Sequence, residues 1–297
     1  MKELSLHYFT ADVEAANRLA SELKIPAYPI QLHKFPDGEG KVRVTPVAGT
    51  AIIYASLNTP NDKLIYLAFA ANALKENAAD RVILVAPYLC YMRQDTAFNA
   101  GEAISQKIIG AYLSIYFERL ITIDPHAHRV EDIQQVFPDC KVDTLSASTL
   151  IAETIGSIEN QVSILLVGPD SESKQWVGAI ADQVNLPFVV AEKIRRDDRD
   201  VDVTFHDKTD IVGKNTFIID DIISSGTTII KCAKALIEMG AASVSVFTTH
   251  ALCSEADLDK ILLAGVDGVH STDSIPHSTN SIHIARLLAA ALREEWQ

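Results

Sequence analysis

The chain has 297 residues, of which 48% are hydrophobic and 22% are charged, which is enough to bury two ordinary hydrophobic cores. Its formal net charge of -13 at pH 7 disfavours non-specific binding to nucleic acid or to an anionic membrane, because both polyanions would be repelled. The apolar runs fall short of the roughly 20 residues that a membrane-spanning helix needs, and the first residues do not resemble a secretory signal, so we expect a cytoplasmic protein.

Four cysteines, Cys90, Cys140, Cys232 and Cys253, lie far apart in the sequence and form no Cys-x-x-Cys pair. This spacing is typical neither of a zinc site nor of a disulfide framework. We therefore expect four buried free thiols.

Short apolar runs rich in valine and isoleucine alternate with segments of helical period along the chain. In the first half the pattern predicts strands at 51–56, 82–86 and 120–123 and helices at 62–76 and 105–116. The second half repeats it, with strands at 163–167, 188–190, 216–220 and 243–248 and helices at 174–183 and 227–239. The alternation predicts an α/β fold of two similar domains, 1–146 and 147–297, each with a parallel sheet flanked by helices.

Two runs in the first half combine charged and aromatic side chains. Phe35-Pro-Asp-Gly-Glu39 carries an aromatic ring and two carboxylates, and an alternating strand, Lys41–Val44, follows it. Arg93-Gln94-Asp95 follows the strand predicted at 82–86 and precedes Asn99-Ala-Gly-Glu-Ala-Ile-Ser105. Taken alone, the first run is equally typical of a hairpin or loop turn, and Arg-Gln-Asp of a solvated cap.

Polar side chains also follow matching strands in the two halves, and ligands of open α/β sheets bind at such strand ends. His126 lies two residues after Asp124 in the run 121–128, and Asp170 lies in the corresponding run of the second half, 167–172. A lone histidine at a strand end is often a hydrogen-bonded structural residue, so that alternative stays open.

A mixed-charge segment, Ala191–Val201, contains Lys193 and Arg195 and shows no helical apolar stripe. Its composition is typical of a solvated loop. Long loops between strands are also the segments from which active-site lids are made, so both interpretations remain open.

The most informative run is 217–228, where an apolar strand ends in Asp220 and Asp221 and the loop Ser224–Thr228 opens a helix. Backbone N–H groups and the positive end of a helix dipole suit a phosphate. Carboxylates beside such a loop suit vicinal sugar hydroxyls, so the run predicts a site for a pentose 5-phosphate. A strand-to-helix turn with Ser and Thr caps is the structural alternative.

This run resembles the phosphoribosyl diphosphate loop of the type I phosphoribosyltransferase fold. The two runs of the first half resemble the ATP-binding motifs of the ribose-phosphate diphosphokinases, and the stretch Asn99–Ser105 is similar to the shorter, archaeal-type members. The resemblance implies two domains of the type I fold, an N-terminal ATP-motif domain and a C-terminal ribose-phosphate-binding domain. It also implies a homo-oligomer.

The resemblance implies a Mg²⁺-dependent transferase of nucleotide biosynthesis. It would move the diphosphoryl group of ATP to the anomeric hydroxyl of ribose 5-phosphate, giving 5-phosphoribosyl 1-diphosphate and AMP. Two alternatives remain: a phosphoribosyltransferase that consumes phosphoribosyl diphosphate, and a non-catalytic regulatory relative. A phosphoribosyltransferase needs the 224–228 loop but not the motifs around Phe35, Arg93 and Lys193.

The family's site residues map onto this sequence by the same resemblance. The nucleotide site would comprise Phe35, stacked on adenine, with Asp37, Gly38, Glu39, Arg93, Gln94, Asp95 and His126. Mg²⁺ would be contacted by His126 and Asp170, and Lys193 and Arg195 would be catalytic. Ribose 5-phosphate would be bound by Arg195, Asp220, Asp221, Ser224, Ser225, Gly226, Thr227 and Thr228.

Overall fold

The computed structural model describes residues 3–97, 99–127, 132–158, 163–197, 200–205 and 211–296, with the backbone alone at 193–197, 200–203, 294 and 296. The chain divides into two compact units. Unit 1 comprises Met1–Leu145, Ser274–Pro276 and Ile284–Gln297, and unit 2 comprises Ser146–Asp273 and His277–His283. Among the described residues, no helix is long and apolar enough to cross a membrane.

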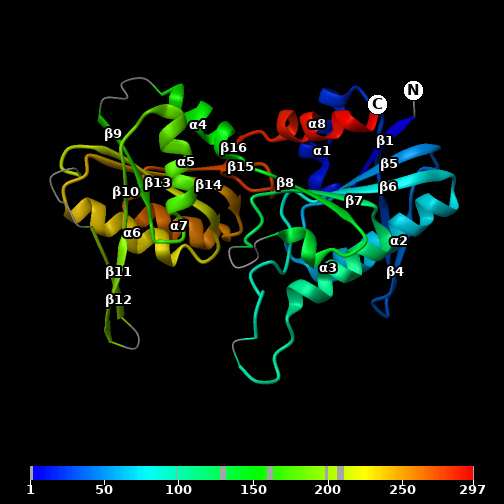
Figure 1. Ribbon diagram of the computed structural model, residues 1–297, viewed down its shortest axis with the longest axis horizontal. Helices are drawn as coiled ribbons and strands as arrows, with labels where there is room; N and C mark the ends of the chain where they lie inside the picture. Colours follow the sequence, from blue (N-terminus) through cyan, green and yellow to red (C-terminus); the bar gives the residue numbers. More distant parts are fainter. Residues whose placement is uncertain are drawn as a thin grey trace. The chain divides into compact units, whose positions relative to one another are not determined.

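Unit 1 is built on a six-stranded parallel sheet with the strand order β2-β1-β5-β6-β7-β8. Figure 1 shows α1 and α8 on one face of this sheet and α2 and α3 on the other. The strands are β1 (Leu4–Tyr8), β2 (Ala27–Pro29), β5 (Gly49–Tyr54), β6 (Ala79–Val85), β7 (Arg119–Ile123) and β8 (Lys141–Leu145). The helices are α1 (Val13–Leu23), α2 (Pro60–Glu76), α3 (Ser105–Tyr116) and α8 (Ala285–Leu292), with short 3-10 turns at Thr10–Asp12, Ile133–Val136 and Arg293–Trp296.

Unit 2 repeats this architecture with the strand order β10-β9-β13-β14-β15-β16, again all parallel. Helices α4 and α5 pack together on one face, and α6 and α7 cover the other (Figure 1). The strands are β9 (Ile164–Gly168), β10 (Phe188–Val190), β13 (Asn215–Ile223), β14 (Ser243–Ala251), β15 (Gly268–Thr272) and β16 (Asn280–Ile282). The helices are α4 (Ser148–Gly156), α5 (Lys174–Val184), α6 (Thr227–Glu238) and α7 (Glu255–Leu263). The prediction of two similar α/β domains is confirmed.

The central strands are buried on both faces, which explains why they read as continuous apolar runs rather than alternating ones. In β6 the run Val82–Val85 has no exposed surface, and in β9 the run Leu165–Val167 is at most 2% exposed. All four cysteines are buried free thiols, as predicted, and burial raises the pKa of Cys90 and of Cys140 to about 12.

Each unit also carries an antiparallel hairpin outside its main sheet. In unit 1, β3 (Gln31–Lys34) pairs with β4 (Gly40–Arg43). In unit 2, β11 (Glu192–Asp197) pairs with β12 (Asp200–Thr204). The interpretation of 191–201 as an irregular loop was therefore wrong for the backbone. Alternating valines in Asp200–Thr204 favour a strand, and the adjacent charges hid that period.

The C-terminal residues belong to unit 1 and not to the second domain expected from the sequence. Arg119 of β7 is 2% exposed and donates hydrogen bonds to Asp143, to Glu295 Oε1 at 2.7 Å and to the Ala291 carbonyl at 3.1 Å. Burial would lower the pKa of Arg119, but the bonds to Glu295 and Asp143 outweigh it and raise the pKa. This ion-pair network and the packing of α8 against α1 hold the C-terminal segment on unit 1.

A buried histidine should make unit 1 sensitive to acid. His7 on β1 has no exposed surface, and burial lowers its pKa from 6.5 to about 4. The unfolded chain binds a proton there between these two pH values and the folded chain does not, so stability falls as the pH drops, by about 3 kcal/mol in total. The variant His7→Leu should lose that part of the dependence. Urea unfolding of both proteins at pH 7 and pH 4.5 measures it, and identical pH slopes would contradict the assignment.

Candidate active site

The strand-to-helix turn of unit 2 has the geometry of an anion site. Strand β13 ends at Ile223, and Ser224–Gly226 lead into α6, whose N-cap is Gly226 with φ 72°. A Cβ at Gly226 would lie 2.7 Å from Ile261 Cδ1, and the positive φ would strain any residue that has one, so glycine is favoured there. Ser225 Oγ lies 3.0 Å from Thr227 Oγ1, and both side chains are exposed. The first amides of α6 have no intrahelical acceptor and, with these hydroxyls, suit a phosphate.

Three carboxylates meet at the same edge of the sheet. Asp220 and Asp221 lie within β13, which extends further than predicted, and Asp170 follows the neighbouring strand β9. Burial, followed by the negative charges of Asp221 and Asp170, raises the pKa of Asp220 well above its usual range. Asp170 is held in place because its Oδ1 accepts backbone N–H bonds from Glu172 at 3.1 Å and Ser173 at 3.2 Å.

This concentration of negative charge fits sugar hydroxyls and a hard cation. Carboxylate oxygens are the ligands that Mg²⁺ prefers, and Mg²⁺ usually takes only one or two from the protein, with water and substrate oxygens completing its shell. Within the described part of the chain, no three His, Cys, Asp or Glu side chains are grouped closely enough to hold a metal.

The hairpin β11–β12 leaves unit 2 at this same edge. It begins one residue after β10, the strand that pairs with β9. Lys193 pairs with Val203 and Arg195 with Val201 across the hairpin. The side chains of Lys193 and Arg195 lie outside the described residues.

In unit 1, the tip of the β3–β4 hairpin presents the aromatic ring predicted to bind adenine. The turn is closed by bonds from the Phe35 N–H to the Glu39 carbonyl at 2.8 Å and from the Gly38 N–H to the Phe35 carbonyl at 3.0 Å. Asp37 Oδ1 accepts from the Glu39 N–H at 3.1 Å. Phe35 is 39% exposed, and its ring lies nearly perpendicular to that of His33, with the ring centroids 4.7 Å apart. The exposed part of the ring is available for contact with a base.

The loops after β6 and β7 lie at one edge of unit 1, because these strands are parallel neighbours. Arg93 is exposed on the first loop, and His126 is partly exposed on the second. The Gln94 amide, by contrast, is used within the loop: Nε2 donates to the Ala103 carbonyl at 2.7 Å, and Oε1 accepts from the Ser105 hydroxyl and backbone N–H. Gln94 thus ties the Arg93 loop to the start of α3.

Sequence reasoning therefore assigned a ligand role to Gln94 but missed its partner Ser105, although the stretch ending at Ser105 was noted for its resemblance. The predicted metal residues belong to different units, His126 to unit 1 and Asp170 to unit 2. Their pairing stays a prediction. Residue His128 of the same run lies outside the described residues.

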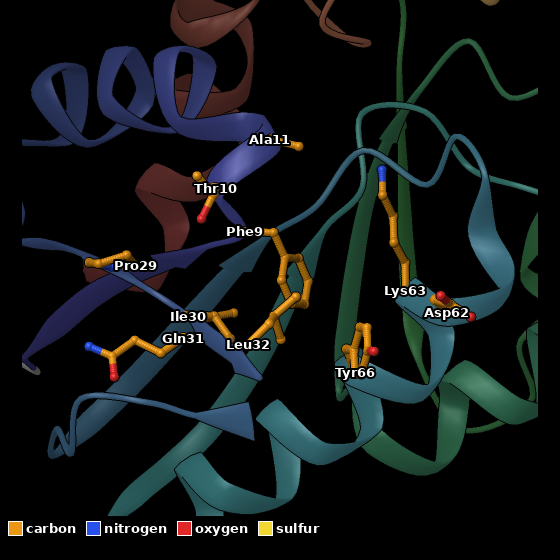
Figure 2. Close-up of a pocket in the computed structure, with 10 residues that line it drawn as sticks. All are labelled: Phe9, Thr10, Ala11, Pro29, Ile30, Gln31, Leu32, Asp62, Lys63 and Tyr66. Atoms are coloured by element: carbon orange, nitrogen blue, oxygen red, sulfur yellow. The ribbon is translucent and has the colours of Figure 1, made fainter. Parts of the chain in front are cut away.

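A cavity of about 430 Å³ in unit 1 contains none of the predicted site residues. Figure 2 shows the rings of Phe9 and Tyr66 among its lining, with Lys63 beside them. The ammonium of Lys63 donates to the Ser56 carbonyl at 2.6 Å and to Asn58 Oδ1 at 2.7 Å. Because that cation already binds the loop before α2, the cavity does not have the character of a phosphate site.

Comparison with known proteins covers nearly the whole chain. A family model described as the N-terminal domain of ribose phosphate pyrophosphokinase matches residues 4–115, and a phosphoribosyl transferase domain model matches residues 145–269. The ribose-phosphate pyrophosphokinase of Methanothermobacter thermautotrophicus is 32% identical, over 96% of this chain and 98% of the relative. The ribose-phosphate pyrophosphokinase of Pyrococcus furiosus is 33% identical, over 91% of this chain and 95% of the relative.

A solved structure agrees with the sequence relatives. The crystal structure of phosphoribosylpyrophosphate synthetase from Mycobacterium smegmatis has a TM-score of 0.86 and 27% identity, over 99% of both chains. The predicted resemblance, including the likeness to archaeal members, is confirmed. The chain belongs to the ribose-phosphate pyrophosphokinase family.

Proposed function

We propose that the protein transfers the diphosphoryl group of MgATP to the anomeric hydroxyl of ribose 5-phosphate, giving 5-phosphoribosyl 1-diphosphate and AMP. One observation supports this proposal above the others. The chain contains the acidic strand end and the phosphate-type loop of 217–228, and it also matches the N-terminal domain of the family. A phosphoribosyltransferase would need the loop alone.

Ribose 5-phosphate is proposed to bind at the carboxyl edge of unit 2. The amides at the start of α6 and the hydroxyls of its loop receive the phosphate, and Asp220 and Asp221 accept hydrogen bonds from the ring hydroxyls. The contributing loop residues are Ser224, Ser225, Gly226, Thr227 and Thr228. The exposure of the loop hydroxyls and the charge coupling of the carboxylates support this assignment.

ATP is proposed to bind to residues of unit 1. Phe35 stacks on the adenine, and the Arg93 guanidinium bonds the phosphate oxygens. His126 and Asp170 are the residues that would contact Mg²⁺, and the ion would supply positive charge to offset that of the two polyanions. The remaining nucleotide contacts would come from Asp37, Gly38, Glu39, Gln94 and Asp95.

Lys193 and Arg195 are proposed to stabilise the transferring diphosphoryl group. Phosphoryl-type transfer needs little covalent chemistry from the protein, so positioning and charge stabilisation supply most of the catalysis. Cations on a hairpin that leaves the acidic edge of unit 2 can close over the substrates and exclude water, which would otherwise hydrolyse ATP. Arg195 is also proposed to contact ribose 5-phosphate.

We further propose that the protein is a cytoplasmic homo-oligomer. Two neighbouring helices of unit 1, α2 and α3, are linked by a hydrogen bond from the Tyr112 hydroxyl to the Leu64 carbonyl at 3.0 Å. They expose large apolar side chains at Ile65 (52%), Phe69 (45%), Ile108 (57%) and Ile115 (70%). A second copy packed on these helices would remove that surface from water. Light scattering of Ile108→Glu against wild type tests this surface.

Replacing Phe35 with alanine should raise the KM for ATP about 5-fold to 150-fold, because a stacked base contributes about 1 to 3 kcal/mol. The KM for ribose 5-phosphate should stay close to the wild-type value. Leu32→Ala is the matched control, since Leu32 is an exposed apolar residue of the same hairpin outside the proposed ATP contacts. A larger effect on ribose 5-phosphate than on ATP would place the adenine elsewhere.

Incubation with MgATP tests the proposed function. AMP should form only when ribose 5-phosphate is present. Formation of a nucleotide from phosphoribosyl diphosphate and a free base, without AMP release from ATP, would identify a phosphoribosyltransferase instead. Failure of a folded protein in both assays would favour the regulatory relative.

A further inference from the structure

The loop that carries Arg93 is held by one buried residue, Gln106, the second residue of α3. Gln106 has no exposed surface. Its side-chain Nε2 donates to the Met92 carbonyl at 3.3 Å, and its backbone N–H donates to the Gln94 carbonyl at 3.2 Å. Met92 and Gln94 flank Arg93, so Gln106 holds a carbonyl group of each of its two neighbours.

The shape of this loop requires such support. Tyr91 has φ 62°, a left-handed conformation that costs energy in any residue with a Cβ. Met92 is 1% exposed and packs in the core of unit 1, whereas Arg93 is exposed. The chain therefore passes from the core at Met92 to the surface at Arg93 within one residue. The hydrogen bonds from Gln106 hold the backbone in this conformation.

Core stability alone does not explain a glutamine at this position. Gln106 Oε1 is buried and has no hydrogen-bond partner among the described residues. A buried amide oxygen without a partner destabilises the fold, and an apolar side chain of similar length would avoid that cost. The bond from Nε2 to Met92 is what an apolar side chain would not supply.

We propose that Gln106 is a positioning residue for ATP: it fixes the backbone of Arg93 so that the guanidinium meets the phosphates. This inference rests on the proposed function, in which Arg93 contacts ATP. The Gln94 side chain adds bonds to Ala103 and Ser105, at the same start of α3. The start of α3 thus holds the loop from which Arg93 is proposed to contact the ATP phosphates.

The variant Gln106→Met keeps the length of the side chain and removes its donor. The KM for ATP should rise about fivefold to tenfold, which corresponds to one hydrogen bond, while the KM for ribose 5-phosphate stays within about twofold. Ser114→Ala is the matched control, because Ser114 is buried on the same helix and its hydroxyl donates to the Gly110 carbonyl, away from the loop. It should shift the melting temperature and leave both KM values unchanged.

A double variant tests whether Gln106 acts through Arg93. Arg93→Ala should itself raise the KM for ATP, and adding Gln106→Met should raise it little further. Fully additive losses would overturn the inference. A raised KM in Arg93→Ala with an unchanged KM in Gln106→Met would also overturn it and leave the proposed function standing. No ribose 5-phosphate-dependent AMP from the wild type would overturn both.

Gln106→Glu provides an independent test if the methionine variant does not fold. The introduced carboxyl can donate to the Met92 carbonyl only while it is protonated, and once ionised it would repel that oxygen. The ratio of the variant's KM for ATP to that of the wild type should therefore rise with pH, at temperatures where both proteins are folded. A ratio above one that is independent of pH, or a ratio of one throughout, would overturn the inference.

Discussion

Replacing Lys193 with alanine should lower kcat by about 100-fold or more and change substrate binding little. The reason is that a cation that meets the diphosphoryl group only during transfer stabilises the transition state and not the bound substrates. Arg195→Ala should lower kcat in the same way, and its second proposed contact should also raise the KM for ribose 5-phosphate.

The control for both variants is Thr204→Ala, a substitution on β12, the partner strand of the same hairpin. It should leave kcat unchanged, which would separate loss of the cations from disturbance of the hairpin. We expect melting temperatures of all three variants to stay close to that of the wild type, because substitutions outside a core usually change stability by about 0.5 kcal/mol or less. Folded Lys193→Ala and Arg195→Ala proteins with wild-type turnover would refute a catalytic role for this hairpin.

Replacing Asp221 with asparagine should raise the KM for ribose 5-phosphate about 10-fold to 150-fold, because a hydrogen bond to a charged group contributes about 1.5 to 3 kcal/mol. Asp221 is 3% exposed, and asparagine keeps its shape while removing its charge. Asp220→Asn should act similarly. Both changes should raise the KM for ATP much less than the KM for ribose 5-phosphate.

Asp182→Asn is the matched control for these two variants. Asp182 is an exposed residue of α5 in the same unit, so its replacement changes the net charge by the same amount without touching the acidic strand end. Both KM values should stay at the wild-type level. An equal rise of the KM values for ATP and ribose 5-phosphate in Asp221→Asn would indicate that this carboxylate has a structural role instead.

Much of the fold was predictable from periodicity. The helix predicted at 105–116 has the bounds of α3, and the helix predicted at 227–239 differs from α6 by one residue. Strand β13 extends three residues beyond its predicted end at Asp220, because β14 continues beside it as far as Ala251. A carboxylate inside a strand breaks the apolar pattern although the backbone pairing continues.

Other features depend on contacts between residues far apart in sequence. The attachment of the C-terminal segment to unit 1 depends on Arg119 reaching Glu295, and sequence pattern alone does not reveal such a pair. In the same way, the burial of Gln106 and the internal bonding of Gln94 arise from how the loop after β6 folds onto α3. The sequence indicated the motif that contains Gln94, but its hydrogen-bond partners emerge only in three dimensions.

The central claim is that the β- and γ-phosphoryl groups of ATP move together to the sugar. ATP labelled with ³²P at the β-phosphorus, incubated with ribose 5-phosphate, Mg²⁺ and the wild-type protein, tests this most directly. The label should appear in the phosphoribosyl product, and the AMP released in equal amount should carry none. Label retained in ADP, or no transfer of label to the sugar by a folded protein, would contradict the proposed diphosphokinase activity.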